Sequence, residues 1–169
     1  MARQVIHQLA HVAPDELQPR PGFVGVGRGN SGSQLLLGAA QAGVIERALE
    51  LTAEHARTRV QFGRPIGAFQ AVAQRLADAY IDVEAVRLTL WQAVWMLSSD
   101  EPGAEMAVAT AKFWAAEAGH RVAHTAVHVH GGMGIDTSSP VHRYFTAAKH
   151  HEFALGGATV QLLRIGAAF

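Results

Sequence analysis

The chain has 169 residues, and its 14 Lys and Arg residues balance its 14 Asp and Glu residues, with no Cys at all. The charge balance removes the electrostatic basis for binding nucleic acid or an anionic membrane surface. The absence of cysteine excludes disulfides, thiolate metal sites and cysteine nucleophiles.

Residues 1–30 have the composition of an irregular leader in front of a single larger domain, residues 31–169. Residues 1–12 could form a short amphipathic helix, whereas residues 13–30 contain three prolines and repeated glycine. The GVGRGN run at residues 25–30, which ends this leader, lacks the lysine and the strand–loop–helix context of a phosphate loop. No signal-peptide pattern or long apolar run is present, so we expect a cytoplasmic protein.

The rest of the chain has the apolar periodicity of helices, which indicates an all-α fold. Ser31 or Ser33 is the expected N-cap of the first long helix. The expected helices span residues 31–59, 67–97, 102–130, 140–151 and 158–167. Gly38 and Gly43 inside the first helix predict close approach by a neighbouring helix.

Trp91 and Trp95 lie one turn apart beside the apolar stripe of the second helix. They fit either the bundle core or a subunit contact, and we favour the core. In the last helix, Leu162 and Ile165 are expected to face inward.

Three histidines of the third long helix, His120, His124 and His128, recur at four-residue steps and therefore share one face. This spacing suits a metal site. No carboxylate or cysteine ligand accompanies them in the sequence, so we predict a partly exposed helix face and no bound metal.

The segment RTRVQFGRPIGAFQ places Arg59, Gln61 and Phe62 at the corner between the first two long helices. A guanidinium, an amide and an aromatic ring together suit an anionic, partly planar ligand, although Arg59 could equally cap its own helix. The HGGMG sequence at residues 130–134 ends the third helix in a turn whose bare backbone can approach a ligand or another chain.

Taken in order, RTRVQFGRPIGAFQAV, AVHVHGGMG and PVHRYF resemble the C-terminal helical domain of the acyl-CoA dehydrogenase family. The resemblance implies an up-down four-helix bundle over residues 31–169 that oligomerises as a dimer or a dimer of dimers. It also suggests that residues 1–30 are a remnant of the family's preceding β-domain.

The resemblance implies FAD as cofactor. Arg59 would contact the pyrophosphate, while Gln61 and Phe62 would line the cofactor. Gly131 and Gly132 would approach the FAD of an adjacent chain. His128 stands where the family often has a glutamine for the cofactor.

Two positions at which the family carries its catalytic carboxylate lack an acid here. One lies in the stretch 154–158, ALGGA, and the other at about Ser33 or Gln34. Proton abstraction from an acyl-CoA requires a positioned base. We therefore assign no catalytic residue and expect the base to come from other domains or from a partner subunit, in a homo- or hetero-oligomer.

Two functions follow. The favoured hypothesis is the C-terminal domain or subunit of an FAD-dependent acyl-CoA dehydrogenase of lipid metabolism, which removes hydrogen across the α,β-bond of acyl-CoA thioesters. The alternative is a non-enzymatic helical oligomerisation module that has lost flavin binding.

Overall fold

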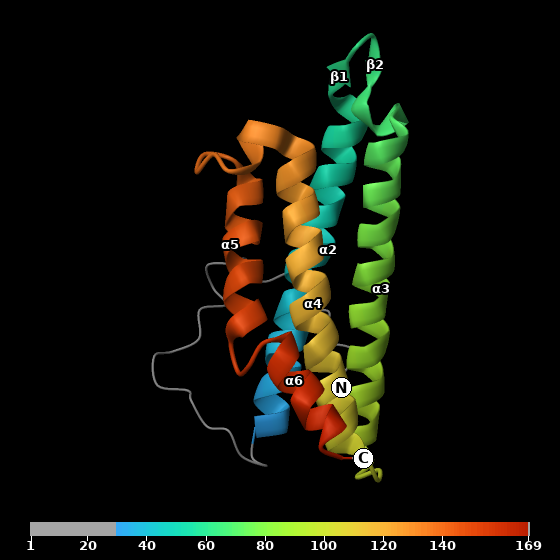
Figure 1. Ribbon diagram of the computed structural model, residues 1–169, viewed down its shortest axis with the longest axis vertical. Coiled ribbons are helices and arrows are strands. Elements are labelled where there is room, and N and C mark those ends of the chain that lie inside the picture. Colours follow the sequence, from blue (N-terminus) through green and yellow to red (C-terminus); the bar gives the residue numbers. More distant parts are fainter. Residues whose placement is uncertain (1–29, 169) are drawn as a thin grey trace.

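The computed structural model describes residues 30–168, which form the bundle of long helices in Figure 1. Its four main helices run alternately up and down: α2 (Ser31–Thr58), α3 (Gln70–Ser98), α4 (Ala104–His130) and α5 (Pro140–Phe153). The shorter α6 (Ala158–Gly166) packs across α4. The all-α, up-down four-helix fold is thereby confirmed. The expected leader lies outside the described residues except for Asn30.

The helix α4 is the centre of the bundle, because it packs against each of α2, α3, α5 and α6. Most buried apolar residues are alanine or valine. Such small side chains allow helix axes to lie close together. A Cβ added to Gly38 would lie 3.2 Å from Leu90 Cδ1, which confirms the expected close approach at that glycine.

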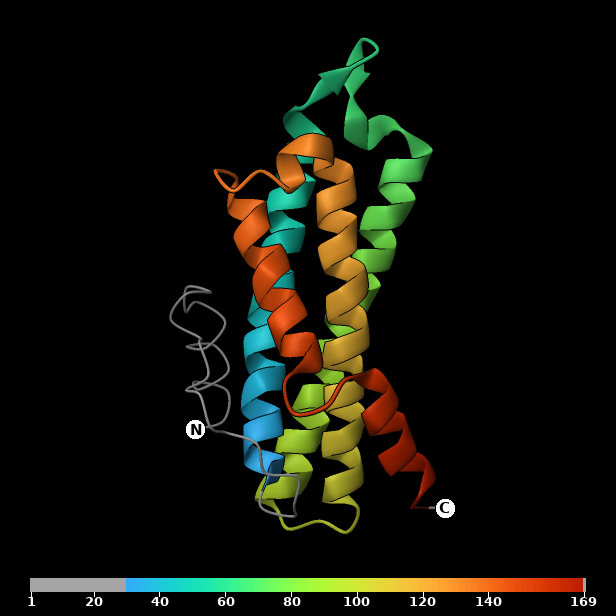
Figure 2. The ribbon, with the colours of Figure 1, turned by 60° about the vertical axis from the view of Figure 1, so that its left-hand side comes forward.

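The helix ends differ from the sequence expectation in two places. The N-cap of α2 is Asn30, one residue before Ser31 and three before Ser33, the two expected N-caps. The first two long helices are joined by a small hairpin of β1 (Val60–Gln61) and β2 (Arg64–Pro65), followed by the single turn η2 (Ile66–Ala68). Figure 2 shows this hairpin projecting beyond the end of the bundle.

Several apolar residues expected in the core are on the surface. Trp95 is 59% exposed and Leu162 is 51% exposed, so both expectations were wrong, whereas Trp91 and Ile165 are half-buried. The helix α3 buries its Val83, Val86 and Leu90 side. Its opposite side carries an exposed apolar ridge, which we call the α3 ridge: Ile81, Leu88 and Trp95.

The interior also contains polar side chains that the apolar pattern did not reveal. Gln41 of α2 is 1% exposed; its Nε2 donates to the Ala148 carbonyl at 3.2 Å, and its Oε1 lies 3.3 Å from His151 Nδ1. Lys112 of α4 is 2% exposed and donates to the carbonyls of His151 and Glu152 at 3.0 and 3.3 Å. These bonds hold the C-terminal turn of α5 against α2 and α4.

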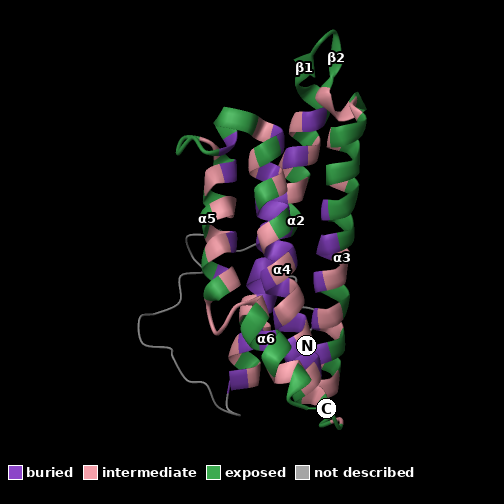
Figure 3. Cartoon of the chain, viewed as in Figure 1, coloured by how far each residue is buried: buried purple, intermediate pink, exposed green. Residues whose placement is uncertain are grey.

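Burial changes the titration of this polar network. It lowers the pKa of Lys112 to about 8, although the Glu152 carboxylate acts in the opposite direction. Burial, assisted by His150 and Lys112, lowers the pKa of His151 to about 4. Figure 3 shows buried residues facing one another through the middle of the bundle, while the hairpin is exposed along its length.

Candidate functional site

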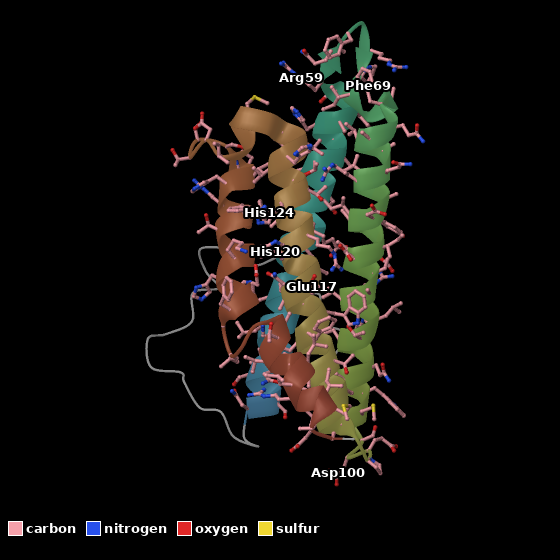
Figure 4. All side chains as sticks on the ribbon, in the orientation of Figure 1. Arg59, Phe69, Asp100, Glu117, His120 and His124 are labelled. Atoms are coloured by element: carbon pink, nitrogen blue, oxygen red, sulfur yellow. The ribbon has the colours of Figure 1, made fainter. Side chains whose placement is uncertain are left out.

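Arg59 lies where α2 ends and the hairpin begins. Its backbone is extended, its N–H donates to the His55 carbonyl at 2.8 Å, and its carbonyl accepts from Ile66 N–H at 2.8 Å. The backbone is thus held at both sides. The Arg59 side chain is exposed and has no ion-pair partner among the described residues, and it lies at the hairpin end in Figure 4.

The hairpin turn presents an aromatic side chain to solvent. Phe62 and Gly63 both have positive φ angles, of 51° and 79°, as a tight two-residue hairpin turn requires. Phe62 is 91% exposed and meets Phe69 edge-on at 6.1 Å between ring centroids. The Arg64 guanidinium lies 4.3 Å above the Phe69 ring. Gln61 is exposed, and its amide donates to the Val60 carbonyl at 2.8 Å.

The glycine turn η3 (Gly131–Gly134) follows α4 at the same end of the bundle. Gly131 has a φ of +61°, and no atom lies within 4 Å of a Cβ built on Gly131 or Gly132. Gly134 is packed tightly instead, because its Cβ would lie 2.8 Å from the backbone of Val127. The first two glycines therefore expose bare backbone, while the last one anchors the turn.

The corner and the glycine turn are connected by two stacked histidines. His55 in the last turn of α2 stacks on His130, the last residue of α4, with ring centroids 4.3 Å apart and planes 23° from parallel. The pKa of His55 is lowered by burial, by His130 and by Arg59. The structure thus brings Arg59, Gln61, Phe62, Gly131 and Gly132 to one end of the bundle.

His128, the sixth expected site residue, is exposed in the last turn of α4. This end therefore offers a guanidinium, imidazoles, an exposed aromatic ring and bare backbone. These groups fit the chemistry of an anionic ligand with planar rings. The stacking of these two histidines was missed by sequence analysis. His55 lies one turn before Arg59, and His130 is the first residue of the HGGMG segment, and these positions were the signal that could have found the pair.

The joint between α5 and α6 contains residues 154–158, one of the two positions where sequence analysis looked for a catalytic acid and found none. Leu155 and Gly156 have positive φ angles of 61° and 95°, and Gln161 Nε2 donates to both of their carbonyls at 3.3 and 3.2 Å. The nearest carboxylate in sequence, Glu152, bonds Lys149 at 2.6 Å and His120 at 3.2 Å. Its oxygens are therefore engaged in α5 and α4.

The position at the start of α2 also lacks a carboxylate, since Ser33 is half-buried and Gln34 is buried. On α4, His120 and His124 lie 4.4 Å apart between ring centroids and point toward α5 (Figure 4). Within residues 30–168, no group of three or more His, Asp or Glu side chains is arranged to hold a metal ion. In the same part of the chain, no helix is both long and apolar enough to cross a bilayer.

Comparison with known proteins defines the class of this bundle. Residues 31–169 match the family model described as acyl-CoA dehydrogenase, C-terminal domain. The chain therefore belongs to the acyl-CoA dehydrogenase family, as the three sequence motifs indicated.

Particular relatives can also be named. The chain is 67% identical over 135 residues to acyl-CoA dehydrogenase FadE27 of Mycobacterium tuberculosis, covering 76% of this chain and 36% of that protein. It is similar to a chain in the crystal structure of the ChsE4-ChsE5 complex from the same organism, with a TM-score of 0.79 and 67% identity over 82% of this chain and 37% of that chain.

A chain of the Tcur3481-Tcur3483 steroid ACAD G363A variant gives a TM-score of 0.79 at 44% identity, covering 81% of this chain and 38% of that one. The chain thus spans little more than a third of the length of these relatives.

Proposed function

We propose that this chain provides the cofactor-facing C-terminal part of an FAD-dependent acyl-CoA dehydrogenase that acts within an oligomer. The observation that carries the proposal is the end of the bundle where Arg59, the exposed Phe62 and the bare Gly131–Gly132 backbone lie together, with no ion-pair partner for Arg59 among residues 30–168. FAD, when bound, accepts the hydride that leaves the β-carbon of an acyl-CoA. The substrate would be an acyl-CoA thioester.

The residues at this end have separate roles in the proposal. Arg59 binds the pyrophosphate, because a guanidinium donates two parallel hydrogen bonds to phosphate oxygens. Gln61 and Phe62 line the cofactor through the amide and the ring. Gly131, Gly132 and His128 contact cofactor held by an adjacent chain.

The base comes from another domain or from a partner subunit. Leu155 and Gly156 occupy the joint without a carboxylate, and Glu152 is bonded to Lys149 and His120. A general base contributes about two to four orders of magnitude in rate, so this chain alone would be nearly inactive as a dehydrogenase.

The α3 ridge is the proposed surface for the partner. Ile81 and Leu88 are each 64% exposed and Trp95 is 59% exposed, and they recur at seven-residue steps along one helix face. A groove of about 570 Å³ lies beside the ridge, between α3 and α4, with Arg75 and Asp78 among its lining residues. Apolar area of this kind on a helix commonly marks a subunit contact. The complex could be a homo- or a hetero-oligomer.

The test is cofactor retention by the purified chain, with and without the product of the adjacent reading frame. We expect stoichiometric absorbance near 450 nm, lost in Arg59→Ala and retained in the matched control Arg87→Ala on the outer face of α3. Acyl-CoA-dependent dye reduction should require the partner. Robust dye reduction by the chain alone would contradict the absence of a base.

The alternative function, a helical oligomerisation module without flavin, is supported by the same exposed α3 ridge. It predicts colourless protein whose oligomeric state is unchanged by Arg59→Ala. Light scattering together with absorbance on the same sample separates the two functions.

A further inference from the structure

The stacked histidines at the functional end have a defined hydrogen-bond state. His130 Nδ1 lies 2.8 Å from the Ala126 carbonyl, and a carbonyl oxygen can only accept, so Nδ1 carries the hydrogen. The second ring nitrogen of His130, Nε2, is therefore the atom that can gain or lose a proton. His55 stacks on this ring from α2 at 4.3 Å.

The charged groups around the pair are nearly all basic. Arg59 and His130 are the two charged groups that act on His55, and both lower its pKa, together with burial. Of the other charged side chains in the last turns of α2, Glu54 and Arg57 pair with each other. Arg64 of β2 lies over Phe69, and His128 of α4 is exposed.

No carboxylate from the described residues therefore compensates a positive charge on the stack. Two imidazolium rings at van der Waals distance repel each other, and Arg59 adds to the repulsion. These surroundings hold the pKa of His55 below its ordinary value. An anion placed beside Arg59 would reverse the sign of the local potential and favour a proton on one ring.

We propose that the His55–His130 pair belongs to the anion site and takes up one proton when a phosphate-bearing ligand binds at the Arg59 corner. The inference rests on the cofactor-binding part of the proposed function and adds two residues and a pH dependence to it. The two rings lie between the corner and the glycine turn, so one added charge acts on both parts of the site. Ligand affinity then rises as pH falls.

The size of the effect follows from linkage. A ligand that raises the pKa of one histidine by about one unit binds up to about tenfold more tightly below that pKa than above it. We therefore expect FAD to bind the apo-protein several-fold, and at most about tenfold, more tightly at pH 6 than at pH 8. The pyrophosphate diester of FAD does not itself titrate in this range.

Isothermal titration calorimetry of FAD into the full chain, in two buffers of different ionisation enthalpy, measures the protons taken up at pH 7. The variant His55→Asn keeps a smaller polar group, an amide, that cannot be protonated. The matched control is His150→Asn, an exposed histidine on α5. Circular dichroism of each variant establishes that it is folded.

We expect wild type and His150→Asn to take up a proton fraction that His55→Asn does not, with the pH dependence of affinity flattened in His55→Asn. A purely structural role would lower affinity equally at both pH values and leave proton uptake unchanged, and that result would overturn the inference while the cofactor site stands. FAD binding to the wild type without proton uptake would likewise overturn the inference and leave the cofactor site standing. Failure of FAD to bind at any pH would overturn the site and the inference together.

Discussion

Replacing Gly119 with alanine is the most informative test of the polar interior. Gly119 lies in the middle of α4, where alanine would normally stabilise the helix by about 1 kcal/mol. Here its Cβ would lie 1.7 Å from Gln41 Nε2 and 2.8 Å from Gln41 Cδ. Because Gln41 is 1% exposed, its amide has no solvent-filled space into which it can move.

The expected cost can be worked from the bonds that Gln41 makes. Moving the amide breaks its bond to the Ala148 carbonyl and its contact with His151 Nδ1. A buried polar group left without a partner costs about 1–3 kcal/mol, and forcing an extra methyl into a packed core costs about 1–3 kcal/mol. After the helix gain is subtracted, we expect a net loss of about 1–5 kcal/mol.

Urea unfolding followed by circular dichroism at 222 nm measures this loss, with the slope of the transition compared between variants. Gly32→Ala in the first turn of α2 is the matched control, since no atom lies within 4 Å of its Cβ. In a Gln41→Ala background the Gly119→Ala change should cost at least about 1 kcal/mol less, because the colliding amide is gone. If Gly119→Ala leaves stability unchanged or raises it, the close contact with Gln41 is refuted.

Three further predictions concern the same region. The folded-state pKa of His151 is about 4, below its ordinary 6.5, so its contribution to stability is complete above pH 6.5 and is lost as pH falls toward 4. Stability should drop by about 2 kcal/mol between pH 7 and 5, and His151→Asn should remove that part of the slope in urea titrations at each pH. The pKa of Lys112 is lowered to about 8, so the folded state loses its proton before the unfolded chain does. Stability should therefore rise by about 1 kcal/mol between pH 7 and 9, and Lys112→Met should abolish the rise. Gly156→Ala should cost about 1–3 kcal/mol, because its φ is +95° and its Cβ would lie 2.9 Å from Val160, whereas Gly166→Ala should be nearly neutral. An unchanged melting temperature for Gly156→Ala would contradict the left-handed backbone at that joint.

The long helices could be predicted because each carries many turns of apolar periodicity, and the error at their ends is only a few residues. The two-residue strands of the hairpin could not, since a strand of that length has no period to detect. The wrong placement of Trp95 has a related cause. Periodicity marks an apolar face without saying whether this chain or another covers it, so the α3 ridge resembles core in the sequence.

The buried polar residues were missed for the opposite reason. Gln41, Lys112 and Gln161 are of types that usually lie on the surface, so composition placed them there. What indicates burial of these residues is the group that each one contacts. Gln41 packs against Gly119, which has no side chain, and Lys112 donates to a carbonyl at the C-terminal end of α5, where helix carbonyls lack partners. These contacts join residues that are far apart in the sequence, so the apolar periodicity of a single helix cannot predict them.

The interior of the bundle and its hairpin end differ in how completely their polar groups are paired. Among residues 30–168, no buried side-chain nitrogen or oxygen lacks a hydrogen-bond partner. The interior is therefore complete as it stands, whereas at the hairpin end the Arg59 side chain has no ion-pair partner in the same part of the chain, and the bare Gly131 backbone faces open space. We infer from this difference that a ligand or a partner chain supplies the missing contacts at the hairpin end. The carboxylate nearest in sequence to the α5–α6 joint, Glu152, is bonded to Lys149 and His120, which agrees with our proposal that the base comes from another domain or a partner subunit.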